Sequence, residues 1–103
     1  MHARDLVKKI QAGKAPCVLD VRSGFEFDSG HIPVAVHAPF MKILWRRVAL
    51  PGEKQSLIVL TCEHGPRAHL TKTLLGLLGY RNIQMFDGHM AGWRRAGLPL
   101  ERE

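Results

Sequence analysis

The spacing of apolar residues alternates along this chain between short continuous runs and longer helical repeats. The repeats predict helices over residues 5–11, 40–48 and 66–78, a short helix capped by Ser23, and a final segment over 89–96. The short runs predict buried strands over 17–21, 34–38, 57–60 and 83–86. Strands that alternate with helices at this rhythm are typical of parallel β-α-β units, so we expect an α/β three-layer sandwich with a mainly parallel central sheet.

A cysteine lies where one predicted strand becomes a helix. The run 57–60 leads directly to Cys62, and the next helix opens at Pro66. Ligands bind at the carboxyl ends of strands in open α/β sheets, and a helix N-terminus presents unpaired N–H groups. These groups and Arg67 favour the thiolate, which is the reactive form of cysteine. The pattern therefore predicts a functional Cys62, whereas Cys17 opens an apolar run and is expected to fill space.

The residues between Cys62 and Arg67 predict a tight loop that binds anions. Glu63, His64 and Gly65 are polar or conformationally permissive, which disfavours the alternative of a buried, space-filling Cys62. Gly65 permits the turn, and Pro66 lacks only an N–H that would have no partner inside the helix. Successive backbone N–H groups in such a loop form a nest for an anion.

Composition limits the classes of protein to consider. The 103 residues allow one domain, 1–103, with 46% hydrophobic and 23% charged residues. The net charge of +6 comes from scattered basic residues, with small clusters such as Arg46–Arg47 and Arg94–Arg95, and indicates no nucleic-acid site. No apolar run approaches the about 18 residues of a membrane span, and no signal peptide is recognisable. We expect a cytoplasmic monomer with two free thiols.

Four spaced signatures then carry a resemblance. They are the segment 19–22, Glu26 followed by 30–33, the loop 62–67, and Asp87–Gly88 with Trp93 and 96–99. With these signatures the chain resembles a single-domain rhodanese of the thiosulfate sulfurtransferase-like family over nearly its whole length. The resemblance implies a four- or five-stranded sheet flanked by helices. It also implies that Cys62 accepts a sulfane sulfur as a persulfide and passes it to a thiophilic acceptor such as cyanide or a thiol.

The other candidate residues are expected to support the loop. By the resemblance Asp20, Arg22 and Glu26 frame the cleft, although an Asp–Arg pair at a strand end is more often structural. His31 is expected to fix a turn, and Trp93 to anchor the last helix in the core. His64 is a proton donor or one half of a metal site, but no second Cys/His cluster accompanies it, so we expect neither metal nor cofactor.

Three departures from the family pattern sharpen the expectations. Many thiosulfate-using members carry a basic residue immediately after the cysteine, where this chain has Glu63, and an acid there would repel a thiosulfate dianion. Val34 stands where glycine is usual, which we interpret as a packing difference. Little chain precedes the first helix to form the first edge strand often seen in the family, so both a four-stranded and a five-stranded sheet stay open.

Two alternative functions stay open from the sequence. One is a sulfur-relay or protein-binding module with little free thiosulfate activity, in which Glu63 pairs with a basic residue of a partner protein rather than being simply solvated. The other is a phosphatase or arsenate reductase. The loop argues against the latter, because Cys62 and Arg67 enclose four residues where the phosphatase motif has five.

Overall fold

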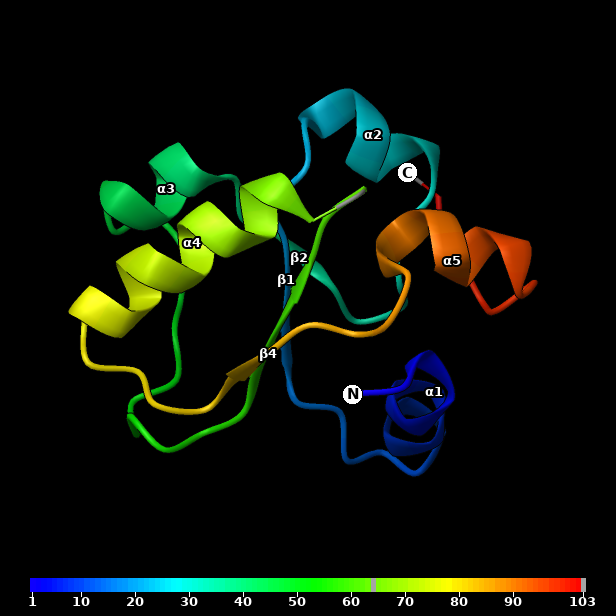
Figure 1. The fold of residues 1–103 in the computed structure, drawn as a ribbon, viewed down its shortest axis with the longest axis horizontal. Coiled ribbons are helices and arrows are strands. Elements are labelled where there is room, and N and C mark those ends of the chain that lie inside the picture. Colours follow the sequence, from blue (N-terminus) through cyan, green and yellow to red (C-terminus); the bar gives the residue numbers. More distant parts are fainter. Residues whose placement is uncertain (64, 103) are drawn as a thin grey trace.

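Four parallel strands form the centre of the molecule in this computed structural model, which describes residues 1–63 and 65–102 (Figure 1). They are β1 (Cys17–Asp20), β2 (Val36–His37), β3 (Ile58–Thr61) and β4 (Ile83–Gln84), in the order β2-β1-β3-β4. β1 and β3 pair along their whole length, from Cys17 opposite Ile58 to Asp20 opposite Thr61. The expected parallel sheet is confirmed, in its four-stranded form.

Five helices surround the sheet in the described part of the chain. They are α1 (Ala3–Gln11), α2 (Gly24–Ser29), α3 (Phe40–Leu44), α4 (Pro66–Leu77) and α5 (His89–Arg95). Figure 1 shows α3 and α4 on one face of the sheet, α1 and α5 on the other, and α2 beside the carboxyl ends of the strands. No described helix is long and apolar enough to cross a membrane.

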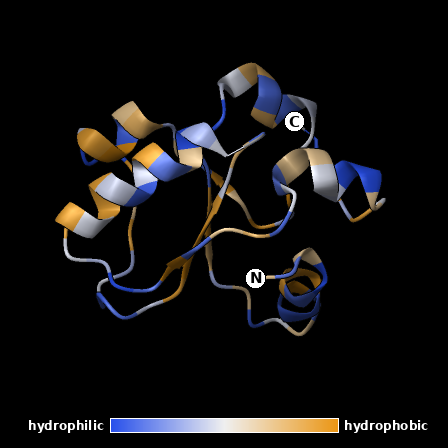
Figure 2. Cartoon of the chain, viewed as in Figure 1, coloured by the Kyte–Doolittle hydropathy of each residue, from blue (hydrophilic) through white to orange (hydrophobic). Residues whose placement is uncertain are grey.

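The strands divide the core into two layers. Leu19 and Leu60 pack in one cluster with the residues beneath α3 and α4, and Val18 and Val59 pack in the other beneath α1 and α5. Successive residues of a strand point to opposite faces, so both faces need apolar residues when helices cover both. Figure 2 shows the resulting hydrophobic colour along the strands. This buried double layer explains why continuous apolar runs predict β1 and β3.

The α5 side is anchored by the last apolar residues. Trp93 is fully buried, and its indole Nε1–H donates to the Pro99 carbonyl at 2.8 Å, so the expected core role is confirmed. Beyond Pro99 the chain turns back toward α2. Glu101 forms an antiparallel bridge with His31 through two backbone hydrogen bonds of 2.8 Å. Arg102 Nε–H also donates to the Ser29 carbonyl at 3.0 Å, which ties this segment to the end of α2.

Three predicted elements are clearly shorter than expected, and the first is the strand predicted over 83–86, which ends at Gln84. The strand predicted over 34–38 is present but covers only Val36–His37. Its expected burial is wrong, since Val36 is half exposed because β2 is an edge strand. Val34 has φ 70° in a turn closed by the Ala35 N–H donating to the Ile32 carbonyl. Glycine is favoured at such a position, so this departure concerns the backbone as well as packing.

The helix predicted over 40–48 ends at Leu44. Arg46 adopts a left-handed conformation with φ 58°, and the Arg47 N–H donates to the Lys42 carbonyl at 2.8 Å. This arrangement closes a helix end by satisfying carbonyls that would otherwise lack partners. Arg46 takes the left-handed place that glycine usually holds, so the sequence carried no signal for the stop.

Candidate active site

Cys62 directly follows β3, and the loop after it leads into α4 at Pro66. Gly65 caps this helix with φ 111°, a conformation that disfavours residues with a side chain. A Cβ at Gly65 would also lie 3.0 Å from Nε2 of His89 at the start of α5. The predicted turn at Gly65 is therefore confirmed, and it is needed both for backbone conformation and for close packing.

The Cys62 side chain is buried, with 1% of its surface exposed. It belongs to the apolar cluster beneath α4, together with Leu60 and Ala68. The polar neighbours in the sequence disfavoured burial, so the structure corrects that expectation. The Cys62 carbonyl accepts a hydrogen bond from the Met90 N–H at 2.9 Å, which connects the loop to α5. Any molecule that reacts with the thiol must therefore enter the loop, or the loop must open, before it meets the sulfur.

Arg67 supplies the positive charge beside this thiol. Its two terminal nitrogens donate to the Glu26 carboxylate at 2.7 and 3.0 Å. These bonds raise the pKa of Arg67, and the hydrogen bond and charge of a Cys62 thiolate act in the same direction. The bond from Arg67 is also the main reason that the pKa of Glu26 falls to about 2. The guanidinium is therefore fixed at the sulfur by an acid from α2.

Glu26 is itself oriented by the start of α2. Its carboxylate accepts from the Ser23 N–H at 3.0 Å, and the Ser23 hydroxyl accepts from the Glu26 N–H at 3.3 Å. This reciprocal pair is a capping box, which confirms the predicted cap at Ser23. The Glu26 carboxylate therefore both caps the start of α2 and holds Arg67.

Asp20 and Arg22 form a buried ion pair at the carboxyl end of β1. Arg22 donates to the Asp20 carboxylate with its terminal nitrogen at 2.8 Å and with Nε–H at 3.0 Å. It also donates to the Gly30 carbonyl at 2.7 Å, joining the strand end to the end of α2. Because these contacts are internal to the protein, they support the structural interpretation of the pair.

His31 packs in the turn after α2, as the sequence predicts. It is 3% exposed, its Nδ1 lies 2.8 Å from the Phe27 carbonyl oxygen, and its ring stacks on Phe27 at a centroid distance of 3.8 Å. The ring is thus held by contacts on α2 itself. These contacts support the turn-fixing interpretation.

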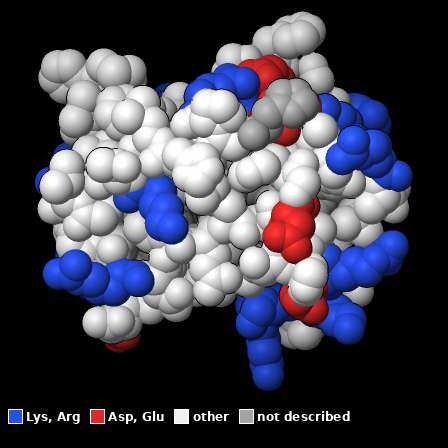
Figure 3. Space-filling view, viewed as in Figure 1, with Lys and Arg blue, Asp and Glu red and all other residues white. Residues whose placement is uncertain are grey.

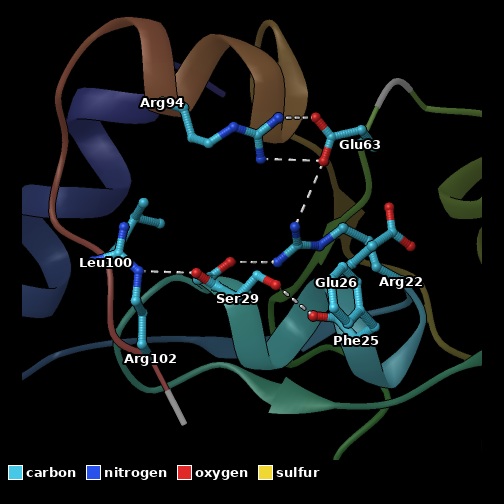
Figure 4. Close-up of a pocket in the computed structure, with 9 residues that line it drawn as sticks. Arg22, Phe25, Glu26, Ser29, Glu63, Arg94, Leu100 and Arg102 are labelled. Atoms are coloured by element: carbon cyan, nitrogen blue, oxygen red, sulfur yellow. Dashed lines mark hydrogen bonds and ion pairs between the residues drawn. The ribbon is translucent and has the colours of Figure 1, made fainter.

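Glu63 is held within the chain rather than solvated. Its carboxylate accepts from both terminal nitrogens of Arg94 on α5, one of them at 3.1 Å, and Arg22 lies 3.6 Å away (Figure 4). The structure therefore corrects both sequence interpretations of Glu63, the solvated residue and the residue left open for a partner's cation. The acid is neutralised by its own protein.

A pocket of about 240 Å³ adjoins this ion pair. It lies between α2, α5 and the C-terminal segment, and Figure 4 shows Arg22, Arg94 and Arg102 around it with the carboxylates of Glu26 and Glu63. Its lining includes three guanidinium groups and two carboxylates, and Arg22 is also paired with Asp20 behind the wall. Guanidinium groups of this kind suit a small anion.

Comparison with known proteins places this site in a family. The model of the Rhodanese-like domain matches residues 2–96. The chain belongs to the rhodanese-like family. A solved rhodanese-related protein of Thermoplasma volcanium superposes with a TM-score of 0.78 at 30% identity, covering 100% of this chain and 97% of that one.

Relatives of this rhodanese-like domain have different lengths. A sulfurtransferase of Allochromatium vinosum is 29% identical over 83 residues, which cover 81% of this chain and 76% of that protein. The HTH-type transcriptional regulator Rv0324 of Mycobacterium tuberculosis is 30% identical over 100 residues, but the match spans only 42% of its length. The rhodanese-like domain is thus similar both to a short sulfurtransferase and to one part of a larger regulator.

Two residues near the Cys62–Arg67 loop of this rhodanese-like domain were not identified as site residues from the sequence. Arg94 looked like half of a scattered basic pair, and its partner Glu63 is 31 positions away along the chain. His89 has a left-handed backbone with φ 52° and lies against Gly65. The available signal was only that His89 follows the predicted turn at Gly88.

Three further predictions about the rhodanese-like domain have different outcomes. His64 lies outside the described residues. Within 1–63 and 65–102 no three His, Cys, Asp or Glu side chains are grouped to hold a metal ion, and the expectation of no metal stays a prediction. Cys17 is a free, half-buried thiol at the start of β1, and burial raises its pKa, in keeping with the expected space-filling role.

Proposed function

We propose that this domain is a sulfurtransferase in which Cys62 carries the transferred sulfur as a persulfide. The observation that carries the proposal is the Arg67 guanidinium beside the thiol, fixed there by two hydrogen bonds to Glu26. A cation at this point stabilises the thiolate and then the negative outer sulfur of the persulfide. The named sulfurtransferase relative supports the same reaction class.

The reaction has two displacement steps. The Cys62 thiolate attacks the outer sulfur of thiosulfate, a sulfur–sulfur bond forms, the donor bond breaks, and sulfite leaves with its electron pair. An acceptor such as cyanide or a thiolate then attacks the outer sulfur of the persulfide, and Cys62 leaves as a thiolate. No external oxidant or reductant is required, since the sulfane sulfur keeps its oxidation level throughout.

The acceptor and the setting of the reaction belong to the proposal. A small sulfur donor, either thiosulfate or a persulfide, loads a monomeric cytoplasmic protein, and a thiol or cyanide unloads it without a cofactor. Because Glu63 is paired with Arg94, its charge is balanced before a thiosulfate dianion arrives. The pairing removes the objection that Glu63 raised against thiosulfate as donor.

Intact mass after incubation with thiosulfate tests the proposal. The wild type gains one sulfur atom, which cyanide then removes. Cys62→Ser gains none, whereas the matched variant Cys17→Ser gains as much as the wild type, since Cys17 lies at the opposite end of the sheet. Thermal unfolding verifies that both variants are folded. Failure of the wild type to gain sulfur from thiosulfate or from a small persulfide, or loading on Cys17, overturns the assignment.

A further inference from the structure

Helices α3 and α4 expose an unusual amount of apolar surface. Met41, Leu44 and Trp45 are 54%, 46% and 66% exposed, and their spacing places them on one face of α3 and its cap. Leu70 on α4 is also more than half exposed. Figure 2 shows the hydrophobic colour along α3 and α4. Contiguous exposed apolar residues commonly mark a binding surface.

This apolar surface reaches the catalytic loop. Met41 and Leu70 line a hollow of about 280 Å³ between the two helices, and Arg67 forms part of its wall. Arg67 is the residue whose guanidinium lies beside Cys62. A chain that settles in the hollow therefore comes close to the sulfur from the α4 side, away from the pocket bounded by Arg94.

Helices α3 and α4 carry positive charge and no acid of their own, and the acid paired with Arg67 at the edge of this surface is Glu26 of α2. Residues 38–52 and 64–86, which contain both helices, include no Asp or Glu. Their cations beside the apolar residues are Lys42, Arg46, Arg47 and Lys72, all exposed. Figure 3 shows no acidic residue over α3 on the face in view. A protein surface with apolar residues and excess carboxylates is complementary to this arrangement.

We propose that an acidic partner protein docks on this face, defined by Met41, Leu44, Trp45 and Leu70 with the four cations, and exchanges sulfur with Cys62 there. The inference rests on the proposed function and adds the kind of partner and its place of contact. A protein is favoured over a lipid surface because the hollow is concave and ends at Arg67, where a partner's cysteine is needed.

The transfer step at this face balances without a co-reactant. The partner's cysteine thiolate attacks the outer sulfur of the Cys62 persulfide, a new sulfur–sulfur bond forms on the partner, and the bond to Cys62 breaks. Cys62 departs as a thiolate, which Arg67 stabilises. The partner's thiol loses its proton to solvent before the attack.

Designed peptides serve as probes for the partner. Two helical peptides each carry one cysteine and the same leucines, but one has glutamates and the other lysines on its polar face. After loading with thiosulfate, the rate of sulfur loss from Cys62 is measured with each peptide and with free cysteine. The glutamate peptide is expected to react about tenfold faster than the lysine peptide at low salt, and added salt narrows the gap.

Single substitutions locate the contact. Leu70→Ser and Trp45→Ser are expected to lower the ratio of glutamate-peptide transfer to free-cysteine transfer by about tenfold. Leu77→Ser is the matched control, because Leu77 is 81% exposed on the same helix but two turns further from the loop. Equal rates with both peptides, or an equal fall in the ratio for Leu77→Ser, overturn the proposal.

Binding measured without chemistry separates this proposal from the proposed function. A labelled glutamate peptide with serine in place of its cysteine binds the wild type more tightly than Leu70→Ser in fluorescence anisotropy, even should Cys62 fail to load. Absence of this difference overturns the docking surface and leaves the proposed sulfurtransferase function unaffected. Cosedimentation with vesicles of equal parts phosphatidylserine and phosphatidylcholine, lost in Leu70→Ser and unaccompanied by peptide binding, assigns the surface to a membrane and also overturns the proposal.

Discussion

The two ends of the loop from Cys62 to Arg67 are held in different ways. At the α4 end Arg67 points its charge at the thiol, and Glu26 of α2 fixes that charge in place. At the α5 end Arg94 is occupied with Glu63, and the Met90 N–H holds the Cys62 carbonyl. One end therefore supplies charge to the reaction, whereas the other sets the position of the loop. Loss of the charge at the α4 end and loss of the contact at the α5 end should therefore change the loading of Cys62 to different extents.

Removal of the charge at the α4 end has the largest expected effect. Arg67→Ala is predicted to slow thiosulfate loading of Cys62 about a hundredfold, since it removes the cation that stabilises the thiolate and the persulfide. Arg67→Lys should recover part of the rate because the charge stays while the paired contact with Glu26 is lost. Loading is followed by intact mass against time. An Arg67→Ala protein that loads at nearly the wild-type rate would show that the charge at the sulfur comes from elsewhere.

Reversing the charge of Arg94 at the α5 end is expected to slow loading less, and a second substitution at Glu63 should restore the rate. Arg94→Glu places two carboxylates together and should slow loading about tenfold. Adding Glu63→Arg restores an opposite pair and should recover most of the loss. Arg95→Glu changes the charge of the neighbouring exposed residue equally and is the control. A double variant no faster than Arg94→Glu alone would contradict a positioning role for the pair.

Acid should weaken the Glu26–Arg67 contact only when the pH falls below the ordinary range of carboxyl titration. The pKa of Glu26 falls from 4.5 to about 2 in the folded protein. The pair's stabilisation is therefore complete above the ordinary pKa and is lost as pH falls through the folded one. Solvent screening limits it to roughly 1 kcal/mol. Urea unfolding from neutral pH downward should show a steeper fall for the wild type than for Glu26→Gln, with Asp28→Asn matching the wild type.

The smallest effect concerns the backbone where α5 meets the loop. His89 has φ 52°, so His89→Gly should be more stable than His89→Ala by about 1 kcal/mol in urea unfolding. Both variants lose the ring that lies against Gly65, and the comparison isolates the backbone. At Ala91, within the helix, glycine should instead destabilise by about 1 kcal/mol. The same ranking at both positions would show that His89 is not strained.

Local features of the site were predictable from the sequence, and long-range pairings were not. The turn at Gly65 and the cap at Ser23 depend on residues within a few positions of each other. Arg67 and Glu26 are 41 positions apart, and their mutual orientation is set by the packing of two helices. Both were recognised as candidates, but no spacing rule connects them.

The errors in the fold have the same origin. The run 34–38 is apolar enough for a buried strand, yet burial depends on a second neighbouring strand, which β2 lacks in the described chain. α3 ends early because Arg46 adopts a left-handed conformation, which an arginine in the sequence does not predict. The burial of Cys62 follows from the cluster beneath α4, which assembles only in three dimensions.

The bridge between His31 and Glu101 connects the two ends of the Cys62–Arg67 loop. Movement at one end is therefore expected to affect the other. The bridge fastens the turn after α2, the helix whose Glu26 holds Arg67, to the segment after α5, the helix whose Arg94 holds Glu63. The amide protons of Glu101 and Met90 should therefore exchange with deuterium in step, because fraying of one releases the other. Amino-acid changes in this segment, which is far from Cys62 along the chain, are therefore expected to alter the reactivity of the thiol.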